Sequence, residues 1–433
     1  MNRPASIPGR RLPAAAGHSI GYAGLILFTI LLYLRPNDLL PIGRFPIVKI
    51  MTIVTLAAFF VERLGKGGPL SVTPRPFKYL LMVAGLTILS IPVGLDPSTS
   101  SGAFSDVFLK TLLVFLLMIN VVSSFRRLRR MMEVTVVCGA GVSALTLVDY
   151  VQGKNLVEGY RAAGGVGGIF ANPNDLALAM NVLLPLSVGL ILSRPRLFSK
   201  LLHVACATVM AAASVVTYSR AGLLTMVIAG AFFLIKVRRR YPAAWALGLL
   251  AGVAILASGP SRLFTLFDPS GGNAMAAGSA EARWELIKRS VEVAGANPVR
   301  WLLGVGLENF HIVSPAEVVN HNAYLQVFNE VGFPALVFYV LFLVSVVRSS
   351  ASVARRYRTA RGFAKVWLTA TAIQTSLIAY VVGSAFASVA FHWYVYYPAA
   401  FAVCLQQIIS HSAQQPAQRE VTPRVWYLRR VQH

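Results

Sequence analysis

The chain has 433 residues, of which 56% are hydrophobic and only 13% are charged, and its mean hydropathy is +0.64. Soluble domains have about 25% charged residues, so this composition excludes a soluble globular protein and predicts a polytopic membrane protein. The net charge of +24 would suggest nucleic acid as a partner of a soluble protein. Most arginines, however, stand in short segments between apolar runs. We therefore interpret the charge as membrane orientation and anionic lipid contact, with no nucleic acid partner.

The apolar runs predict about twelve membrane-spanning helices, at roughly 20 residues per span. The first run follows a basic segment and lacks a small-residue cleavage site, so we interpret it as a retained helix rather than a signal peptide. The expected spans lie near residues 20–34, 46–62, 79–95, 105–122, 131–151, 175–193, 201–219, 221–236, 242–258, 326–347, 366–388 and 393–410. The predicted fold class is an all-α polytopic integral membrane protein. A long extracytoplasmic loop, residues 258–320, separates its ninth and tenth helices.

The connections between these runs predict the orientation of the protein. Every even-numbered connection is basic, as are both ends of the chain. The basic residues of these connections are Arg63, Lys66, Arg75, Lys78, Arg126, Arg127, Arg129, Arg130, Arg194, Arg196, Lys200, Lys236, Arg238, Arg239, Arg240, Arg355, Arg356, Arg358, Arg361 and Lys365. By the positive-inside rule, the tails 1–19 and 411–433 are cytoplasmic and the odd-numbered connections face outward. We expect one membrane domain, residues 20–410, without the internal repeat of many transporters.

The long outer loop has a helical pattern of its own. Ser279 is a suitable N-cap, and Trp284, Ile287 and Val291 follow at helical spacing, with charged residues on the opposite face. We expect an amphipathic helix on the outer leaflet, with Trp284 as its interfacial anchor.

Four cations near the outer surface are candidates for binding an anion. Arg220 stands in YSRAG between two apolar runs, where a charge is costly and usually functional, although it could snorkel to lipid phosphate. Arg283 lies on the amphipathic helix, where a basic residue normally faces lipid. Lys49 and Lys110 each lie a few residues inside the outer end of a helix. Both could line an outward pocket or snorkel.

Two polar segments complete the outer surface. In GGVGGIFANPND (164–175), Asn172 and Asn174 flank Pro173 at a helix start whose N-terminus would favour an anion; a flexible loop with an ordinary cap is the alternative. His321 opens HNAYLQVFNEVG (321–332) and could exchange a proton near neutral pH, or be an ordinary capping histidine. Glu330 falls on the opposite helix face, so we predict no His–Glu dyad.

The acidic residues and histidines do not predict a metal site. The chain has six Asp and ten Glu without a DxD pair, and His311 and His392 lack metal-ligand spacing. We therefore expect no metal and no cofactor. Arg and Lys side chains would have to neutralise an anionic substrate.

These segments together resemble the O-antigen ligase and polysaccharide polymerase superfamily of bacterial envelopes. The resemblance rests on FANPNDLA (170–177), YSRAGLL (218–224) and HNAYLQVFNEVG (321–332), in this order and on one predicted side. Within the outer loop, GSAEARWEL and GVGLENF also resemble the family's arginine helix and glycine turn. The similarity covers residues 160–350, and the flanking spans only by topology.

The resemblance implies glycan transfer on the outer face of the bacterial cytoplasmic membrane. The donor would be an undecaprenyl-diphosphate-linked glycan, and the acceptor a hydroxyl of another glycan, lipid A core or protein. Arg220 and Arg283 would hold the diphosphate, and His321 would act on the acceptor hydroxyl as a base or orienter. We add Lys49 and Lys110 as diphosphate contacts. Tyr218, Asn322, Asn172 and Asn174 are further candidates for substrate binding.

Several functions remain open at this point. The motifs do not separate a ligase from a polymerase or from a protein O-oligosaccharyltransferase. A multi-span transporter and a non-catalytic assembly subunit are the alternatives from other classes. Against a transporter stand the missing repeat and the position of the polar residues at the outer surface instead of the midplane.

Overall fold

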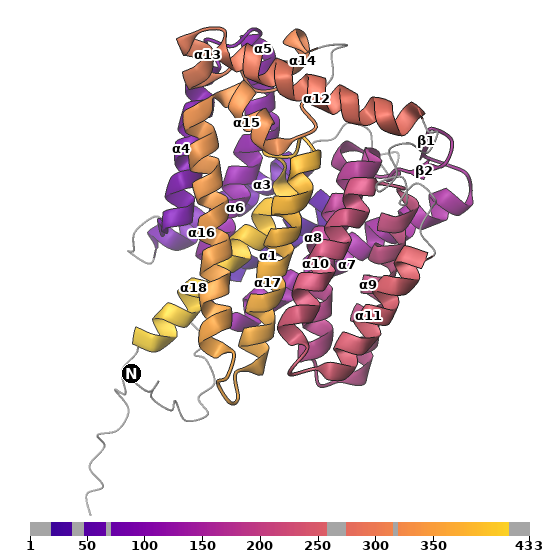
Figure 1. The fold of residues 1–433 in the computed structure, drawn as a ribbon. Coiled ribbons are helices and arrows are strands. Elements are labelled where there is room, and N and C mark those ends of the chain that lie inside the picture. The colour runs from indigo at the N-terminus through magenta and orange to yellow at the C-terminus, as the bar shows by residue number, and fades with distance from the viewer. Residues whose placement is uncertain (1–18, 37–46, 66–70, 258–273, 315–318, 415–433) are drawn as a thin grey trace, which may run out of the picture.

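The chain folds as a bundle of helices that is crossed at one end by further helices (Figure 1). The computed structural model describes residues 19–36, 47–65, 71–257, 274–314 and 319–414. The long helices are α1 (Ser19–Leu34), α3 (Ile47–Leu64), α4 (Arg75–Ser90), α6 (Leu109–Val121), α7 (Phe125–Val151), α8 (Pro173–Ser193), α9 (Leu197–Val216), α10 (Arg220–Val237), α11 (Pro242–Ala257), α16 (Phe333–Tyr357), α17 (Ala364–Gly383) and α18 (Tyr396–Gln414).

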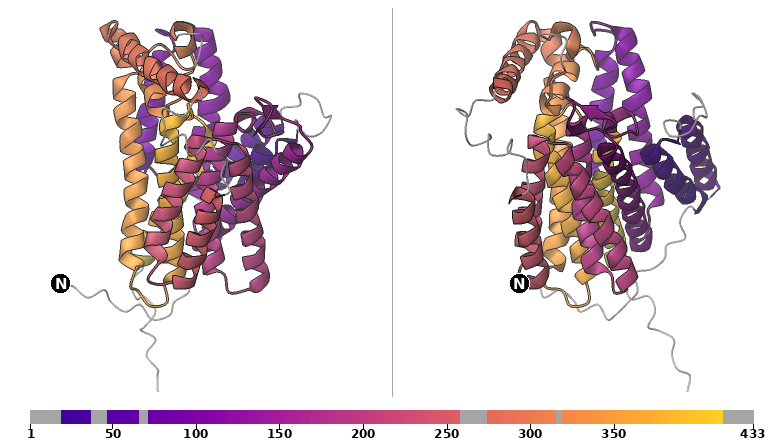
Figure 2. Two further views of the ribbon diagram at one scale, coloured as in Figure 1. Left: turned by 45° about the vertical axis from the view of Figure 1, so that its right-hand side comes forward. Right: turned by 90° about the vertical axis from the view of Figure 1, so that its right-hand side faces the viewer.

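The remaining elements fill the connections. They are α5 (Pro97–Ala103), the π-helical turn η1 (Phe104–Phe108), β1 (Leu156–Val157), β2 (Arg161–Ala162), η2 (Gly168–Ala171), α12 (Ala274–Gly295), α13 (Pro298–Leu303), α14 (Phe310–Val313), α15 (Ala323–Val331), η5 (Ser384–Phe386) and η6 (Trp393–Val395). Both further views keep α12 across the same end of the bundle as in Figure 1 (Figure 2). We call this end, which carries α5 and α12–α15, the loop end.

The all-α fold class is confirmed, and a helix overlaps each of the predicted apolar runs. Among the described residues, seven helical segments are both long and apolar enough to cross a membrane. The helices at Ile20–Leu34 and Pro242–Ala254 are apolar but shorter. The chain is therefore polytopic, while the number of twelve spans stays a prediction.

The basic connections gather at the opposite end of the bundle, which we call the basic end. Arg194 forms an ion pair with Glu133, which joins the end of α8 to α7. Arg240 donates from Nη1 to the carbonyl oxygen of Arg358 at 3.2 Å, which joins the turn after α10 to the turn after α16. Arg194 and Arg240 thus belong to even-numbered connections and lie at the basic end, while the orientation of the protein in the membrane stays a prediction.

Helices α8 and α17 form the centre of the bundle, and they are the most completely buried of the apolar helices. A Cβ on Gly189 of α8 would lie 2.5 Å from the Cβ of Ala372 in α17, so the small side chains allow the two backbones to approach closely. Ser376 donates to the carbonyl oxygen of Val182 at 2.5 Å across the same contact. This pair is the rigid support for the segments at the loop end.

Two boundaries at the loop end differ from the prediction. The expected span 326–347 is two helices, α15 and α16, because Gly332 between them adopts φ 99° and ψ 171°, a conformation outside the helical region. The amphipathic helix begins at Ala274 rather than after a cap at Ser279. The residues AMAAG before Ser279 are rich in alanine, the strongest helix former, and extend the helix by one turn.

Candidate functional site

The start of α8 is a capped helix terminus. Asn172 has extended backbone angles, and its Oδ1 accepts a hydrogen bond from the backbone N–H of Asn174 at 2.8 Å. Pro173, which has no N–H, occupies the first helical position, where none is needed. The structure therefore shows that Asn172 is the N-cap of α8. The side chain of Asn174 lies free of the cap, and its Oδ1 has another partner, described below.

The YSRAG turn joins α9 to α10 at the end of these helices away from the basic turns. Tyr218 has φ 51°, a left-handed conformation that is uncommon for a residue with a side chain. Ser219 caps α10, accepting from the N–H of Gly222 at 3.1 Å, while its own N–H donates to Thr217 Oγ1 at 3.2 Å. Arg220 is half-buried and is the first residue of α10. The turn thus fixes the backbone of Arg220 at the start of a helix.

A buried amide holds this turn onto the bundle. Asn181 of α8 donates from Nδ2 to the carbonyl oxygen of Gly222 at 2.6 Å, and its Oδ1 accepts from Ser214 of α9 at 3.1 Å. One side chain in the central helix therefore links α9 and α10 close to Arg220. Both ends of the amide are satisfied, as buried polar groups generally are.

Arg161, which the sequence analysis did not select, joins two segments of this site, the start of α8 and the YSRAG turn. Its Nε donates to the carbonyl oxygen of Thr217 at 3.2 Å, and its Nη2 donates to Asn174 Oδ1 at 2.9 Å. Its Nη1 pairs with Glu158 at 3.3 Å. The structure therefore brings together Asn174 and the Tyr218–Arg220 turn. The signal in the sequence was an arginine in an odd-numbered connection, where the orientation rule does not call for one.

His321 and Asn322 open α15 at the loop end. Asn322 is its N-cap and accepts from the backbone N–H groups of Tyr324 at 2.9 Å and Leu325 at 3.1 Å. His321 is half-buried and has φ 48°. The Tyr324 hydroxyl donates to the carbonyl oxygen of Val381 at 2.8 Å, which anchors the beginning of α15 on α17. Since α17 also packs on α8 and α10, it connects this segment with the turn at Arg220.

The GVGLENF segment docks beside the other end of α15. The backbone N–H groups of Val305 and Gly306 donate to the carbonyl oxygens of Asn329 at 2.8 Å and Glu330 at 3.0 Å. At Gly304, with φ 71°, a Cβ would lie 2.4 Å from the carbonyl carbon of Glu330. Glycine is therefore required for this close backbone contact. Glu330 is buried, and burial together with the nearby Glu308 carboxylate raises its pKa.

Helix α12 has three faces. Leu286, Ser290 and Val293 are buried against the molecule, whereas Trp284 and Val291 belong to an exposed apolar stripe. Trp284 is 58% exposed, and its role as an interfacial anchor stays a prediction. The side chain of Arg283 falls outside the described part of the structure, although its backbone lies within the helix.

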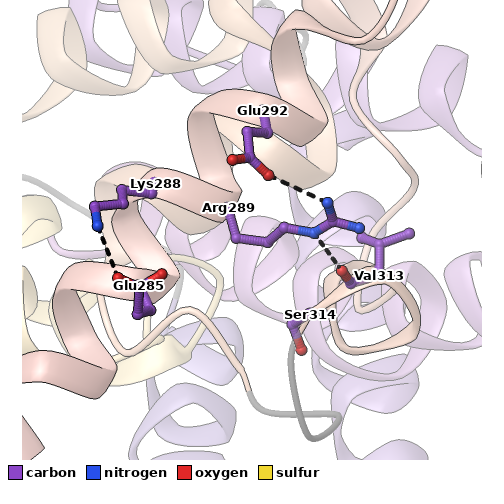
Figure 3. A pocket seen from close by; sticks show the side chains of 6 residues that line it. All are labelled: Glu285, Lys288, Arg289, Glu292, Val313 and Ser314. Carbon is purple, nitrogen blue, oxygen red and sulfur yellow. Dashed lines mark hydrogen bonds and ion pairs between the residues drawn. The ribbon is translucent and has the colours of Figure 1, made fainter.

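The charged face of α12 borders a pocket of about 370 Å³ (Figure 3). Arg289 crosses it, donating from Nε to the carbonyl oxygen of Val313 at 2.9 Å and pairing with Glu292 at 3.2 Å. Lys288 and Glu285 form a second ion pair at 2.7 Å (Figure 3). These contacts tie α12 to α14, and each charge faces a partner from the same helix.

The two lysines occupy different surroundings. Lys110 on α6 forms an ion pair with Asp106 of η1, with 3.1 Å between Nζ and Oδ1. Lys49 lies near the start of α3 and is exposed. Among the described residues, no three His, Cys, Asp or Glu side chains are grouped as metal ligands.

Comparison with known families identifies the central part of the chain. Residues 205–340 match the family model for O-antigen ligase. The chain is thus similar to the O-antigen ligase family over this segment. A comparison with curated proteins found no match. The O-antigen ligase segment runs from α9 into α16 and includes Arg220, Arg283 and His321, while Asn172, Asn174 and both lysines precede it.

This match has two functional consequences. It supports an enzyme of the O-antigen ligase type in the membrane, with a role in polysaccharide biosynthesis. For the matched family, it implies lipid-linked glycan donors and polysaccharide acceptors.

Proposed function

We propose that the protein transfers a glycan from undecaprenyl diphosphate to an acceptor hydroxyl, as an O-antigen ligase or surface-polysaccharide polymerase. The observation that carries the proposal is the O-antigen ligase match, which covers Arg220, Arg283 and His321 in one segment. The reaction takes place on the outer side of the bacterial cytoplasmic membrane, with both termini in the cytoplasm. The separation of the basic turns from the loop end supports this orientation.

Arg220 and Arg283 bind the diphosphate and stabilise the charge that it gains when the glycosidic bond breaks. Arg283 belongs to α12, the helix that also carries Ser290. Ser290 donates to Asn320 Oδ1 at 3.2 Å, directly before His321 in the chain. This contact between α12 and the segment that begins with His321 supports a shared role of Arg283 and His321.

His321 acts on the acceptor. The acceptor oxygen attacks the anomeric carbon, the bond from that carbon to the diphosphate oxygen breaks, and the configuration inverts. The imidazole orients the acceptor hydroxyl through a hydrogen bond or also takes its proton. The diphosphate leaves as an anion held by guanidinium groups, and the step proceeds without a metal. The exposed stripe of α12 meets the outer leaflet, where the lipid tail of the donor enters.

The deciding experiment is transfer by the purified protein in lipid nanodiscs. Undecaprenyl-diphosphate glycan is supplied alone and then with lipid A core. A ladder from the donor alone identifies a polymerase, and a product only with lipid A core identifies a ligase. His321→Ala should lower the rate by about 100-fold or more. Absence of any product, with labelled solute uptake into vesicles that His321→Ala leaves unchanged, would overturn the proposal in favour of a transporter.

A second pair of variants tests the diphosphate contact. Arg220→Lys keeps the charge but replaces a planar fork with a single ammonium group, so we expect it to restore little of the about 100-fold loss in Arg220→Ala. The matched control is Arg196→Lys, an exposed arginine at the basic end. Equal kinetics of Arg220→Lys and wild type would contradict the assignment.

A further inference from the structure

The β1–β2 hairpin lies against the turn that carries Arg220. Its strands pair Leu156 with Ala162 and Val157 with Arg161 in antiparallel register. Glu158 and Gly159, at φ 56° and 79°, close the hairpin. A two-stranded hairpin is only marginally stable on its own in water, so this one depends on what it contacts.

The guanidinium group of Arg161 forms hydrogen bonds with three segments of the protein. It donates to the carbonyl oxygen of Thr217 before the YSRAG turn, to Asn174 at the start of α8, and to Glu158 within the hairpin. Its side chain is only 14% exposed. Every nitrogen of the guanidinium is engaged, so the arginine is a brace between segments rather than a contact for substrate.

The backbone conformation of Tyr218 explains why the turn needs support from neighbouring segments. A left-handed residue with a Cβ is strained, and such a residue persists only where its surroundings enforce it. The ring of Tyr160 meets the ring of Tyr218 edge to face, with centroids 5.4 Å apart and planes at 86°. The Tyr218 hydroxyl also lies 3.3 Å from the hydroxyl of Tyr150 at the end of α7. The hairpin thus holds the turn at two adjacent points, Thr217 through Arg161 and Tyr218 through Tyr160.

We propose that Arg161 is a positioning residue that sets the place of Arg220 in the glycan-transfer site. It fixes the turn 217–219 relative to the start of α8, and Arg220 follows that turn immediately. The amide oxygen of Asn174 serves this brace and not the substrate. The effect of Arg161 on catalysis rests on the proposed function. The restraint that Arg161 places on the turn is a property of the fold and does not depend on that function.

The restraint itself is measured by hydrogen exchange of peptides in nanodiscs, without any substrate. Arg161→Gln removes charge-assisted hydrogen bonds, so we expect exchange at residues 215–223 to increase about tenfold or more. Peptides at the basic end should stay unchanged. Arg240→Gln is the matched control, because Arg240 also donates to a backbone carbonyl of another connection. Unchanged exchange at 215–223 in Arg161→Gln would overturn the brace, whether or not the protein transfers glycan.

The link to catalysis is measured by a double-mutant cycle on glycan transfer. Arg161→Gln should lower kcat/KM about tenfold or more, and Arg161→Lys should not restore it, because one ammonium group cannot reach all three acceptors. In an Arg220→Ala background, Arg161→Gln should cause no further loss. Independent, multiplying losses would show that Arg161 contacts substrate itself and would refute the positioning role. An inactive wild type would refute the proposed function and leave the exchange result standing.

Discussion

Replacement of Gly332 by alanine should show that the backbone geometry at the loop end requires a glycine between α15 and α16. Gly332 joins α15 to α16 with φ 99° and ψ 171°. A Cβ at this position would lie 2.3 Å from the carbonyl oxygen and 2.4 Å from the carbonyl carbon of Leu302. These are backbone atoms of α13, so a rotamer change cannot relieve the overlap. Either α13 moves away or the joint rotates, and α15 moves with it.

The loss in stability has two parts. The backbone conformation, which is nearly exclusive to glycine, costs alanine about 1–3 kcal/mol. Displacement of a packed element adds about 1–3 kcal/mol, the usual cost of overpacking. We therefore expect Gly332→Ala to lower the free energy of unfolding by about 2–6 kcal/mol, out of a total that is typically about 5–15 kcal/mol.

Two further glycines provide controls. Gly362 has φ 82°, and a Cβ there would meet no atom within 4 Å. Gly362→Ala should therefore lower the free energy of unfolding by only about 1–2 kcal/mol, the cost of the left-handed backbone conformation for alanine. Gly230 inside α10 also has open space, and Gly230→Ala should gain up to about 1 kcal/mol in helix propensity. The assay is thermal unfolding in nanodiscs, followed by glycan transfer. If Gly332→Ala were no less stable than Gly362→Ala, the contact with Leu302 would not determine the joint.

Three further outcomes are expected. A membrane-impermeant maleimide should label Lys288→Cys but not Arg361→Cys in intact cells, and the reverse pattern would invert the orientation; background is low because Cys138, Cys206 and Cys404 are buried. EDTA should leave transfer unchanged, whereas loss with recovery on adding Mg²⁺ would refute the metal-free mechanism. Burial and the Glu308 carboxylate raise the pKa of Glu330, so the unfolded carboxyl ionises first and stability falls as pH rises above about 4.3. Glu330→Gln should therefore raise the unfolding midpoint near neutral pH and lose this advantage in acid; a pH-independent difference would contradict the reasoning.

The sequence predicts the helices well because a membrane helix satisfies its own backbone hydrogen bonds and needs mainly length and apolarity. The expected span 201–219, for example, corresponds to α9 at Leu197–Val216. The division at Gly332 was missed because apolar residues continue on both sides of it. Its cause is the close approach of Leu302, thirty residues earlier, and periodicity contains no information about that contact.

In the candidate site, too, features that depend on neighbouring residues were predictable, and features that depend on distant contacts were not. The cap at Asn172 was recognisable because a cap depends on residues two or three positions away, and it is present. The cap at Asn322 was not predicted, although it depends on equally local contacts. The unusual connection in which Arg161 stands was a signal, but its partners were not recognisable by any local pattern, since one of them is the backbone carbonyl oxygen of Thr217, 56 residues later. Every residue has a backbone carbonyl group, so the sequence does not indicate which residue provides this acceptor.

The bonds of these side chains also restrict what each can offer a diphosphate. The amide oxygens of Asn172, Asn174 and Asn322 all accept hydrogen bonds within the protein. An amide oxygen would in any case repel phosphate oxygens, so any contact of these residues with the diphosphate must come from their Nδ2 groups. Lys110 differs, because its ion pair with Asp106 is exposed, and such pairs contribute only about 0–1 kcal/mol. A diphosphate can displace Asp106 at little cost, and the pair is therefore compatible with the predicted role of Lys110.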